Sequence, residues 1–333
     1  MKKILILEAY SNQALAIAKH IKAYSHFYVV GAIEHERKFL RQHYDTVIVQ
    51  NYTSIDKDTY SYILPMGADD TYRFLSQHQI LHYHNHIAFS HSNLRVFDKS
   101  KMLQLADGLK VPVPKSYYDQ SKIKHFPIFY KEGFEKGGGT RGIAYQANEI
   151  PPGKGLLYQE YIATPSTYGV AFLAKDGHIL TYTTHKEVIS YPTTGGSSVV
   201  IEAYEDERLL IYTQKLLKAL EYNGWGLAEY KYCDKKEDFV FMEINAKFWA
   251  SIEFMLRNDP QFLDYLLGIK YSKKVTQRIL FINRLLKYKL FDLLGNLYHI
   301  LDSTIVKESN LSYQLLRKFI PNIFIRLLQK ARK

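Results

Sequence analysis

Three side chains with oxygen ligands, Glu229, Glu243 and Asn245, carry the clearest chemical signal in this sequence. They lie on two strand-forming segments, residues 226–232 and 241–251, which are joined by a short polar stretch. This pattern predicts an antiparallel hairpin, and a three-residue loop would place Glu229 directly opposite Glu243. Asn245 would then share their face of the sheet, because side chains alternate along a strand with a period of two.

Two facing carboxylates repel each other unless something positive lies between them. Carboxylate and amide oxygens are hard ligands, the set expected for a Mg²⁺ ion that also keeps waters and nucleotide phosphates. Glu229, Glu243 and Asn245 are therefore predicted to bind Mg²⁺, or Mn²⁺ in its place. A surface hairpin that carries these acids incidentally is the alternative that the hairpin alone leaves open.

A glycine-rich segment supplies a second chemical signal. Gly137, Gly138 and Gly139 lie between two predicted strands and follow Lys131, which ends the apolar run of the first strand. Glycines let backbone N–H groups approach phosphate oxygens, and a flexible loop can close over a nucleotide. A glycine-rich hairpin loop without a ligand explains the same pattern. The sequence matches neither GxxxxGK[ST] here nor GxGxxG after the first strand, which excludes a P-loop and a dinucleotide site.

The composition indicates a globular protein of a reducing compartment. Of the 333 residues, 47% are hydrophobic and 14% aromatic, which excludes a disordered chain. The single cysteine, Cys233, cannot form an internal disulfide bond. The first apolar run, Ile4 to Leu7, stops at Glu8 and is too short for a signal peptide. No uncharged stretch is long enough to span a membrane, and we therefore expect a cytoplasmic protein.

The order of the predicted elements indicates a mixed α/β fold. Strands and helices that alternate through about residue 93 predict a small parallel α/β domain. From Asp98 onward, several antiparallel strands with turns predict a region built on a sheet. We place the domain limits at residues 1–93, 94–267 and 268–333, with a lid subdomain at about residues 115–190.

The order of these motifs resembles the ATP-grasp superfamily. The match is to its carboxylate-amine ligase branch, which is related to the ATP-binding domains of biotin carboxylase and carbamoyl-phosphate synthetase. The likeness runs from Met1 to about Leu267, and its most specific element is FMEINAKFWAS at residues 241–251. Two lysines also match the family, Lys99 ahead of the segment VPVPK and Lys131 ahead of the segment GGGTRG. The other matching segments are AEYKY, QEYI and GGSSVVIEAYEDERL.

The resemblance implies an ATP-grasp fold and a role for each residue of the site. Glu229, Glu243 and Asn245 would hold one or two Mg²⁺ ions. The implied ATP-binding residues are Lys99 and Lys131 at the α- and β-phosphates, Gly137, Gly138 and Gly139 in the lid, and Glu160, Tyr161 and Ile162 at the adenine; Lys186 and Lys247 would be catalytic, at the transferred phosphate. In the implied reaction, a small-molecule carboxylate attacks the γ-phosphate of ATP, and an amine displaces phosphate from the acylphosphate.

Three departures from the family pattern keep a second function open. Ala246 and Lys247 replace the family's proline and arginine, and lysine lacks the bidentate fork that arginine offers to phosphate. Residues Thr164 to Gly169 contain no acid for the ribose, and Arg257 to Phe262 differ on the expected acceptor side. The alternative is a nucleotide-binding regulatory or scaffolding protein without ligase turnover. Such a protein would have no need of two facing carboxylates.

The tail beyond residue 267 holds all of the excess positive charge. Residues 270–333 contain 14 lysine and arginine residues against three acids, and the whole chain has a net charge of +11. Helical periodicity at residues 278–301 and 311–328 predicts two basic amphipathic helices, the second kinked at Pro321. Such helices pack on the body, pack on a second subunit in a homodimer, or lie on an anionic membrane. No nucleic-acid-binding pattern is visible, so we expect no nucleic-acid partner.

The membrane alternative carries its own functional expectation. A ligase held by this tail would work peripherally at the inner face of the membrane. Its substrate would then be a membrane-associated or cell-surface polymer precursor.

Overall fold

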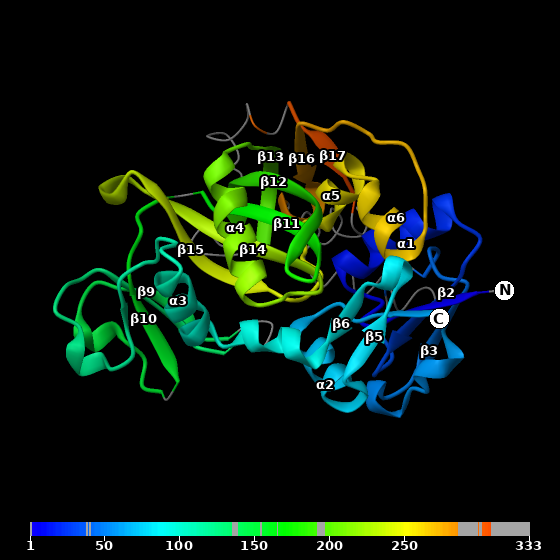
Figure 1. Cartoon of the computed structure of the whole chain (residues 1–333), viewed down its shortest axis with the longest axis horizontal. Helices are drawn as coiled ribbons and strands as arrows, with labels where there is room; N and C mark the ends of the chain where they lie inside the picture. The colour runs from blue at the N-terminus through cyan, green and yellow to red at the C-terminus, as the bar shows by residue number, and fades with distance from the viewer. Residues whose placement is uncertain are drawn as a thin grey trace, which may run out of the picture.

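The structure is a computed structural model, in which the described residues form three larger sheets and a two-stranded hairpin (Figure 1). The residues that it describes are 2–37, 39, 41–134, 139–153, 155–164, 166–191, 197–285, 299 and 302–307. Short 3-10 helices connect several elements, at Tyr52–Ser54, Lys57–Thr59, His84–His86, His91–Phe97, Gln120–Lys122, Ala147–Glu149 and Asp234–Lys236.

The N-terminal unit is built on a parallel sheet with the strand order β3-β2-β1-β4. Its strands are β1 (Lys3–Ile6), β2 (Tyr28–Ile33), β3 (Thr46–Val49) and β4 (Tyr62–Leu64). Central strand β1 is a short apolar run that is buried on both faces from Ile4 onward, as parallel strands require. Two helices accompany this sheet, α1 (Asn12–Tyr24) and α2 (Ala68–His78). The predicted small parallel α/β fold of this region is confirmed.

A small hairpin leads from this unit to the next. Its strands are β5 (Ile80–His82) and β6 (Ala88–Ser90), and helix α3 (Lys99–Gly108) follows. The Asp98 carboxylate caps α3 by accepting a hydrogen bond from the Lys101 N–H. The cap fixes the start of the helix, and thereby the position of Lys99 in its first turn.

The second sheet lies within the range predicted for the lid and is antiparallel, with the order β7-β10-β8-β9. Its strands are β7 (Ser116–Tyr117), β8 (Ile128–Glu132), β9 (Arg141–Ala144) and β10 (Leu156–Glu160). It has a small apolar core of its own around Ile128 and Tyr158. In Figure 1 this sheet and the N-terminal unit lie on opposite sides of the view.

The third and largest sheet has the order β15-β14-β11-β12-β13-β16-β17. Its strands are β11 (Tyr168–Lys175), β12 (His178–Tyr191), β13 (Ser197–Ala203), β14 (Gly224–Cys233), β15 (Asp238–Asn245), β16 (Arg278–Phe281) and β17 (Thr304–Val306). Helix α4 (Glu207–Ala219) packs against β11 and β12. Helices α5 (Ile252–Asn258) and α6 (Gln261–Leu267) also contact β12, and α5 packs on α1 of the N-terminal unit.

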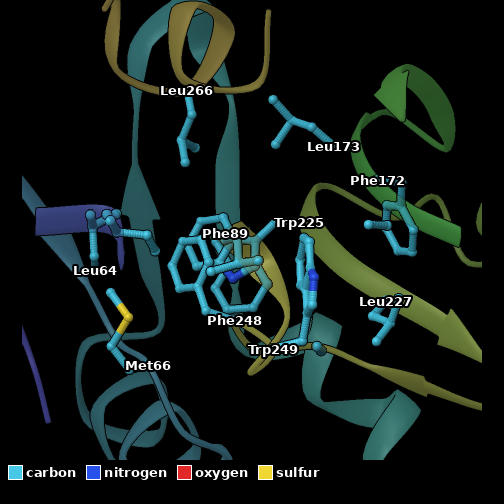
Figure 2. Packing of buried hydrophobic residues seen from close by; sticks show 14 of the residues in the cluster. Leu64, Met66, Phe89, Phe172, Leu173, Trp225, Leu227, Phe248, Trp249 and Leu266 are labelled. Carbon is cyan, nitrogen blue, oxygen red and sulfur yellow. The ribbon is translucent and has the colours of Figure 1, made fainter. Parts of the chain in front are cut away.

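A stack of three aromatic rings joins the hairpin β5–β6 to the large sheet (Figure 2). The Trp225 ring lies 4.2 Å from the Phe89 ring and 4.4 Å from the Phe248 ring, in near-parallel pairs. All three rings are almost completely buried. Such pairs contribute about 0.5 to 1.5 kcal/mol each beyond the burial of their surface. The stack anchors the ends of β14 and β15 and thereby positions the side chains of the site.

The helix predicted at residues 278–301 is wrong at its start. Residues Arg278–Phe281 form β16, which pairs with β13, and β17 adds a further strand at the sheet edge. A continuous apolar run fits a buried strand as well as a helix, and Arg278 is held to the neighbouring strand by Glu202 at 2.6 Å.

The chain does turn helical after β16, at α7 (Ile282–Leu285). Apart from residue 299, the rest of that predicted helix lies outside the described residues, as does the whole of the second one, residues 311–328, so their helicity stays a prediction. Within the described part of the chain, no helix is both long and apolar enough to cross a membrane. The domain limits also remain predictions, with the large sheet continuing past residue 267.

Candidate active site

Glu229 and Glu243 pair directly in the β14–β15 hairpin, as the sequence predicts. The loop between the strands has four residues, 234–237, and not three. A β-bulge at Met242 compensates for the additional residue by shifting the register between the loop and the two acids. The predicted facing pair is therefore present, although the predicted loop is one residue too short.

Two buried lysines hold Glu243. The Glu243 Oε2 atom lies 3.1 Å from Lys131 Nζ and 3.2 Å from Lys99 Nζ. Burial alone would raise the pKa of Glu243, but Lys131 and Lys99 outweigh it and hold the pKa well below its ordinary value. Burial in turn lowers the pKa of Lys131, against the opposing effect of Glu243. Because Lys131 lies on β8 and Lys99 on α3, the lid and the large sheet meet at this carboxylate.

Glu229 has the opposite electrostatic environment. Burial, followed by the charges of Glu243 and Glu187, raises the pKa of Glu229 to about 8. The Asn245 side chain donates a hydrogen bond from Nδ2 to Glu229 Oε2 at 3.1 Å, and Nδ2 lies 3.4 Å from Glu243 Oε1. A buried acid with this pKa is largely protonated at neutral pH, and a nearby cation would ionise it.

The donor set at the hairpin fits a Mg²⁺ ion. Two carboxylates and an amide oxygen are available, because rotation of the Asn245 amide exchanges its nitrogen for its oxygen. Among the described residues, no cluster of three or more histidine, cysteine, aspartate or glutamate side chains is placed to hold a metal. A Mg²⁺ site beside a nucleotide needs only one or two carboxylates, which act together with phosphate oxygens and water.

The lid loop meets the site at Gly139, which has a φ of 116°. This left-handed backbone favours glycine, and a Cβ atom there would also lie 2.8 Å from Glu132 Oε2. Glu132 in turn accepts a hydrogen bond from the Thr140 N–H at 3.1 Å. Gly137 and Gly138 lie outside the described residues, so their predicted contact with phosphate stays a prediction.

The segment expected at the adenine begins at Glu160, the last residue of β10. Glu160 accepts a hydrogen bond from the Lys115 N–H at 2.9 Å and lies 3.1 Å from Lys236 Nζ. Burial would raise the pKa of Glu160, but the Lys115 amide and Lys236 together lower it. Tyr161 and Ile162 follow without a break and line the same cavity as Glu160.

A cavity of about 570 Å³ connects these groups. This volume lies within the range of small-molecule sites. The predicted site residues that line it are Lys99, Lys131, Gly139, Glu160, Tyr161, Ile162, Glu229, Glu243, Asn245 and Lys247. A larger hollow of about 870 Å³ lies beside β12, α4 and α6, but none of the predicted site residues lines it. The described predicted site residues, apart from Lys186, therefore line the smaller cavity.

Lys186 is the one described site residue that the structure does not bring to this cavity. Its ammonium group lies over the Tyr168 ring, 5.9 Å from the centroid. The neighbouring residue on β12, Glu187, lines the cavity instead. Because side chains alternate along a strand, Glu187 and Lys186 point to opposite faces of the sheet. The structure therefore places Lys186 away from the cavity, and its contact with the transferred phosphate stays a prediction.

Sequence reasoning missed several charged residues of the cavity, among them Lys231, Glu187 and Glu8. Lys231 lies two positions after Glu229, so the period of a strand brings both side chains to the same face. Its Nζ atom donates to the Thr164 carbonyl at 3.3 Å, in the segment that lacks an acid. Burial lowers the pKa of Lys231, against the charges of Glu187 and Glu229. That strand period was the signal that would have identified Lys231.

No sequence-family model and no curated protein matches this chain. Solved structures match it at low identity. Biotin carboxylase from Campylobacter jejuni, in complex with an ATP ligand, is 17% identical with a TM-score of 0.61, over 83% of this chain and 74% of that chain. N5-carboxyaminoimidazole ribonucleotide synthetase from Thermotoga maritima is 15% identical with a TM-score of 0.60, over 83% of this chain and 78% of that chain.

Pyruvate carboxylase from Rhizobium etli is 16% identical with a TM-score of 0.59, over 75% of this chain. The present chain spans only 26% of that enzyme's length. These similarities, together with the order of lid, large sheet and N-terminal unit, identify the fold. The chain has the ATP-grasp fold, as its motifs predict.

Proposed function

We propose that this chain is an ATP- and Mg²⁺-dependent ligase that activates a carboxylate as an acylphosphate and joins it to an amine. The observation that carries this proposal is the facing pair Glu229 and Glu243, with Lys131 and Lys99 on the second carboxylate, in a cavity bounded by the lid. A nucleoside triphosphate carries several negative charges, and a metal site together with buried cations neutralises them.

Each group has a defined place in the proposed complex. Lys99 and Lys131 would bind phosphate oxygens, and the segment from Glu160 to Ile162 would contact the adenine. Glu229, Glu243 and Asn245 would hold Mg²⁺. When bound, Mg²⁺ neutralises charge on the phosphates. Lys131 and Lys99 would then exchange part of their contact with Glu243 for the phosphates.

The proposed reaction needs no protein nucleophile. A carboxylate oxygen of the substrate attacks the γ-phosphorus of ATP, and the bond from that phosphorus to the ADP oxygen breaks. The amine nitrogen then attacks the acyl carbon, phosphate leaves, and one proton is released from the nitrogen. The protein contributes positioning and charge neutralisation, for which Lys247 is the described candidate at the phosphate that moves.

Two observations favour a second candidate, a nucleotide-binding protein without ligase turnover. Lys247 stands where the family has an arginine, and Lys231 donates to Thr164 where an acid would contact the ribose. A regulatory or scaffolding protein of this kind would bind MgATP but release no ADP in response to a carboxylate and an amine.

The deciding experiment is a screen of carboxylates and amines for substrate-dependent ADP release by the full chain. Hydroxylamine is added in parallel, because it converts an acylphosphate to a hydroxamate whatever the natural amine is. The ligase proposal requires ADP and hydroxamate to form together and Glu243→Gln to form neither. Glu205→Gln, at an exposed acid outside the cavity, is the matched control. MgATP binding without ADP release for any pair would instead favour the second candidate.

A further inference from the structure

Glu187 lines the cavity from a side that no proposed nucleotide contact occupies. It lies on β12, and Ser190 and Ser198 line the cavity beside it, near the end of β12 and the start of β13. The residues assigned to Mg²⁺ come from β14 and β15, and β11 separates those strands from β12 in the sheet. Apart from Lys186, which lies away from the cavity, none of the residues predicted for ATP or Mg²⁺ belongs to β12 or β13. This side of the cavity is therefore available to a substrate other than the nucleotide.

Two serine hydroxyls orient the Glu187 carboxylate. Ser190 Oγ donates a hydrogen bond to Glu187 Oε2 at 3.0 Å, and Ser198 Oγ donates to Oε1. Ser198 is only 4% exposed. The two oxygens of an ionised carboxylate accept about four hydrogen bonds in total, so each can accept a further one from a ligand. A carboxylate that is held in this way on the cavity wall is suited to bind a hydrogen-bond donor.

Arg284 joins this wall to the segment that follows the proposed phosphate contact. It is 3% exposed, and its Nη1 atom donates to the Ser198 carbonyl at 2.6 Å. Its Nη2 atom donates to the Ala250 carbonyl at 2.7 Å. Ala250 comes three residues after Lys247, the candidate at the phosphate that moves, and both residues line the cavity. Glu187 therefore lies on the wall next to the proposed site of phosphoryl transfer.

The surroundings of Glu187 favour a positively charged ligand. Burial raises the pKa of Glu187, although the serine hydroxyls and the charges of Lys231 and Arg284 oppose the shift. Lys231 donates to the Thr164 carbonyl, and Arg284 donates to the two carbonyls of the wall. An additional positive group beside Glu187 would stabilise its ionised form, whereas a phosphate or a substrate carboxylate would be repelled.

We propose that Glu187 binds the ammonium form of the amine substrate and takes its proton. The inference rests on the proposed ligase function, because it assigns the amine to the wall beside the transferred phosphate. A primary ammonium group has three N–H donors, which form charge-assisted hydrogen bonds with a carboxylate. It has no lone pair with which to attack, so it must lose a proton before the amide bond can form. A carboxylate whose pKa is raised by burial is better suited to take that proton.

The proposed step balances as follows in atoms and electrons. One proton moves from the ammonium nitrogen to a Glu187 oxygen, and the electrons of that N–H bond remain on nitrogen as a lone pair. The lone pair attacks the acyl carbon, and the bond from that carbon to the phosphate oxygen breaks, with its electrons leaving on phosphate. A second proton passes from nitrogen to the departing phosphate as the amide forms. Glu187 then returns its proton to solvent.

Binding is tested on the full chain by saturation-transfer NMR, with methylammonium chloride as the probe. The wild type should show saturation transfer to methylammonium and none to tetramethylammonium, which has no N–H donor. Glu187→Gln keeps the shape of the side chain but removes its charge. It should weaken methylammonium binding by about tenfold or more, the usual effect of losing a hydrogen bond to a charged group. Glu205→Gln, at an exposed acid outside the cavity, should bind as the wild type does.

Glu187→Asp is the second variant, because it keeps the charge but draws the carboxylate back by one methylene group. Its affinity for methylammonium should lie between those of the wild type and Glu187→Gln, with circular dichroism confirming that each variant is folded. The inference is overturned by a wild type without saturation transfer, or by a folded Glu187→Gln or Glu187→Asp variant with unchanged affinity.

Proton transfer is tested with a carboxylate that supports ADP release, and with methylammonium and hydroxylamine as alternative acceptors at neutral pH. Methylamine is almost wholly protonated under these conditions, whereas hydroxylamine is mostly unprotonated and needs no base. The ratio of methylamide to hydroxamate should therefore fall by about a hundredfold in Glu187→Gln, the scale of general-base catalysis. An unchanged ratio would show that Glu187 only supports the two serines, and would overturn the proton transfer.

MgATP binding by the wild type is measured separately by calorimetry. A wild type that binds methylammonium through Glu187 but does not bind MgATP would refute the proposed function and leave the ammonium site standing. A wild type that binds MgATP and not methylammonium would refute only the ammonium site.

Discussion

Glu229 and Glu243 face each other across one pair of strands, yet their pKa values are shifted in opposite directions. Lys131 and Lys99 contact Glu243, whereas Glu229 accepts a hydrogen bond from the neutral amide of Asn245. In the absence of metal, Glu243 is therefore charged and Glu229 is largely protonated at neutral pH. The first two predictions separate these two acids.

Glu229→Gln should leave the fold intact in metal-free buffer, because glutamine resembles the protonated acid. Burial raises the folded-state pKa of Glu229 to about 8, above its unfolded value of about 4.3. The stability from this group is therefore fully present below the unfolded pKa and is lost as pH rises toward 8. The free energy of unfolding of Glu229→Gln, relative to wild type, should rise between pH 5 and pH 8.

Urea unfolding in the presence of EDTA across this pH range measures that difference, with Glu205→Gln expected to run parallel to the wild type. A difference that does not change with pH would refute the assignment of the raised pKa to Glu229. Mg²⁺-dependent ADP release by Glu229→Gln should also fall by at least about tenfold, as expected for weakened metal binding.

Glu243→Gln should destabilise the protein as well as abolish turnover. The pKa of Glu243 is lowered, so its stabilising effect is present above the unfolded pKa and is lost as pH falls. Removal of the charge leaves Lys131 and Lys99 buried without this partner, at an expected loss of about 3 to 5 kcal/mol. Denaturant unfolding at pH 7 measures the loss. An unchanged midpoint would mean that solvent reaches the lysines freely.

Lys131→Met should weaken ATP binding by about tenfold, the scale of a hydrogen bond to a charged group. Methionine keeps the apolar stem of the buried lysine, and Lys99 still pairs with Glu243, so the fold should persist. Calorimetry with MgATP measures the affinity, and Lys124→Met, at an exposed lysine of the lid region, is the control. Equal ATP affinity in wild type and Lys131→Met would remove Lys131 from the proposed site.

The basic tail should direct where the protein works and not what it catalyses. If it lies on a membrane, the full chain should bind vesicles that contain anionic lipid and dissociate as salt rises, since each basic residue contributes about 1 kcal/mol. Glutamine at Arg317, Lys318, Arg326 and Lys330 should abolish vesicle binding while ADP release from a soluble substrate persists. Co-sedimentation without preference for anionic vesicles would favour packing on the body or on a second subunit.

The local sequence pattern was sufficient to predict the hairpin that carries Glu229 and Glu243. The strand period of two sets which side chains share a face, and this holds even though the loop is one residue longer than predicted, because the bulge at Met242 restores the register. The local patterns of strands and helices predicted a parallel α/β unit followed by an antiparallel sheet, and the ATP-grasp fold itself was predicted from the resemblance of the motifs to that superfamily.

Tertiary structure decided which charged side chains meet in the cavity. Lys186 and Glu187 are adjacent in sequence, and only the packing of the sheet shows that Glu187 faces the site. Tertiary structure also decided that residues Arg278–Phe281 form a strand, because an apolar run becomes a strand or a helix according to the neighbour that buries it.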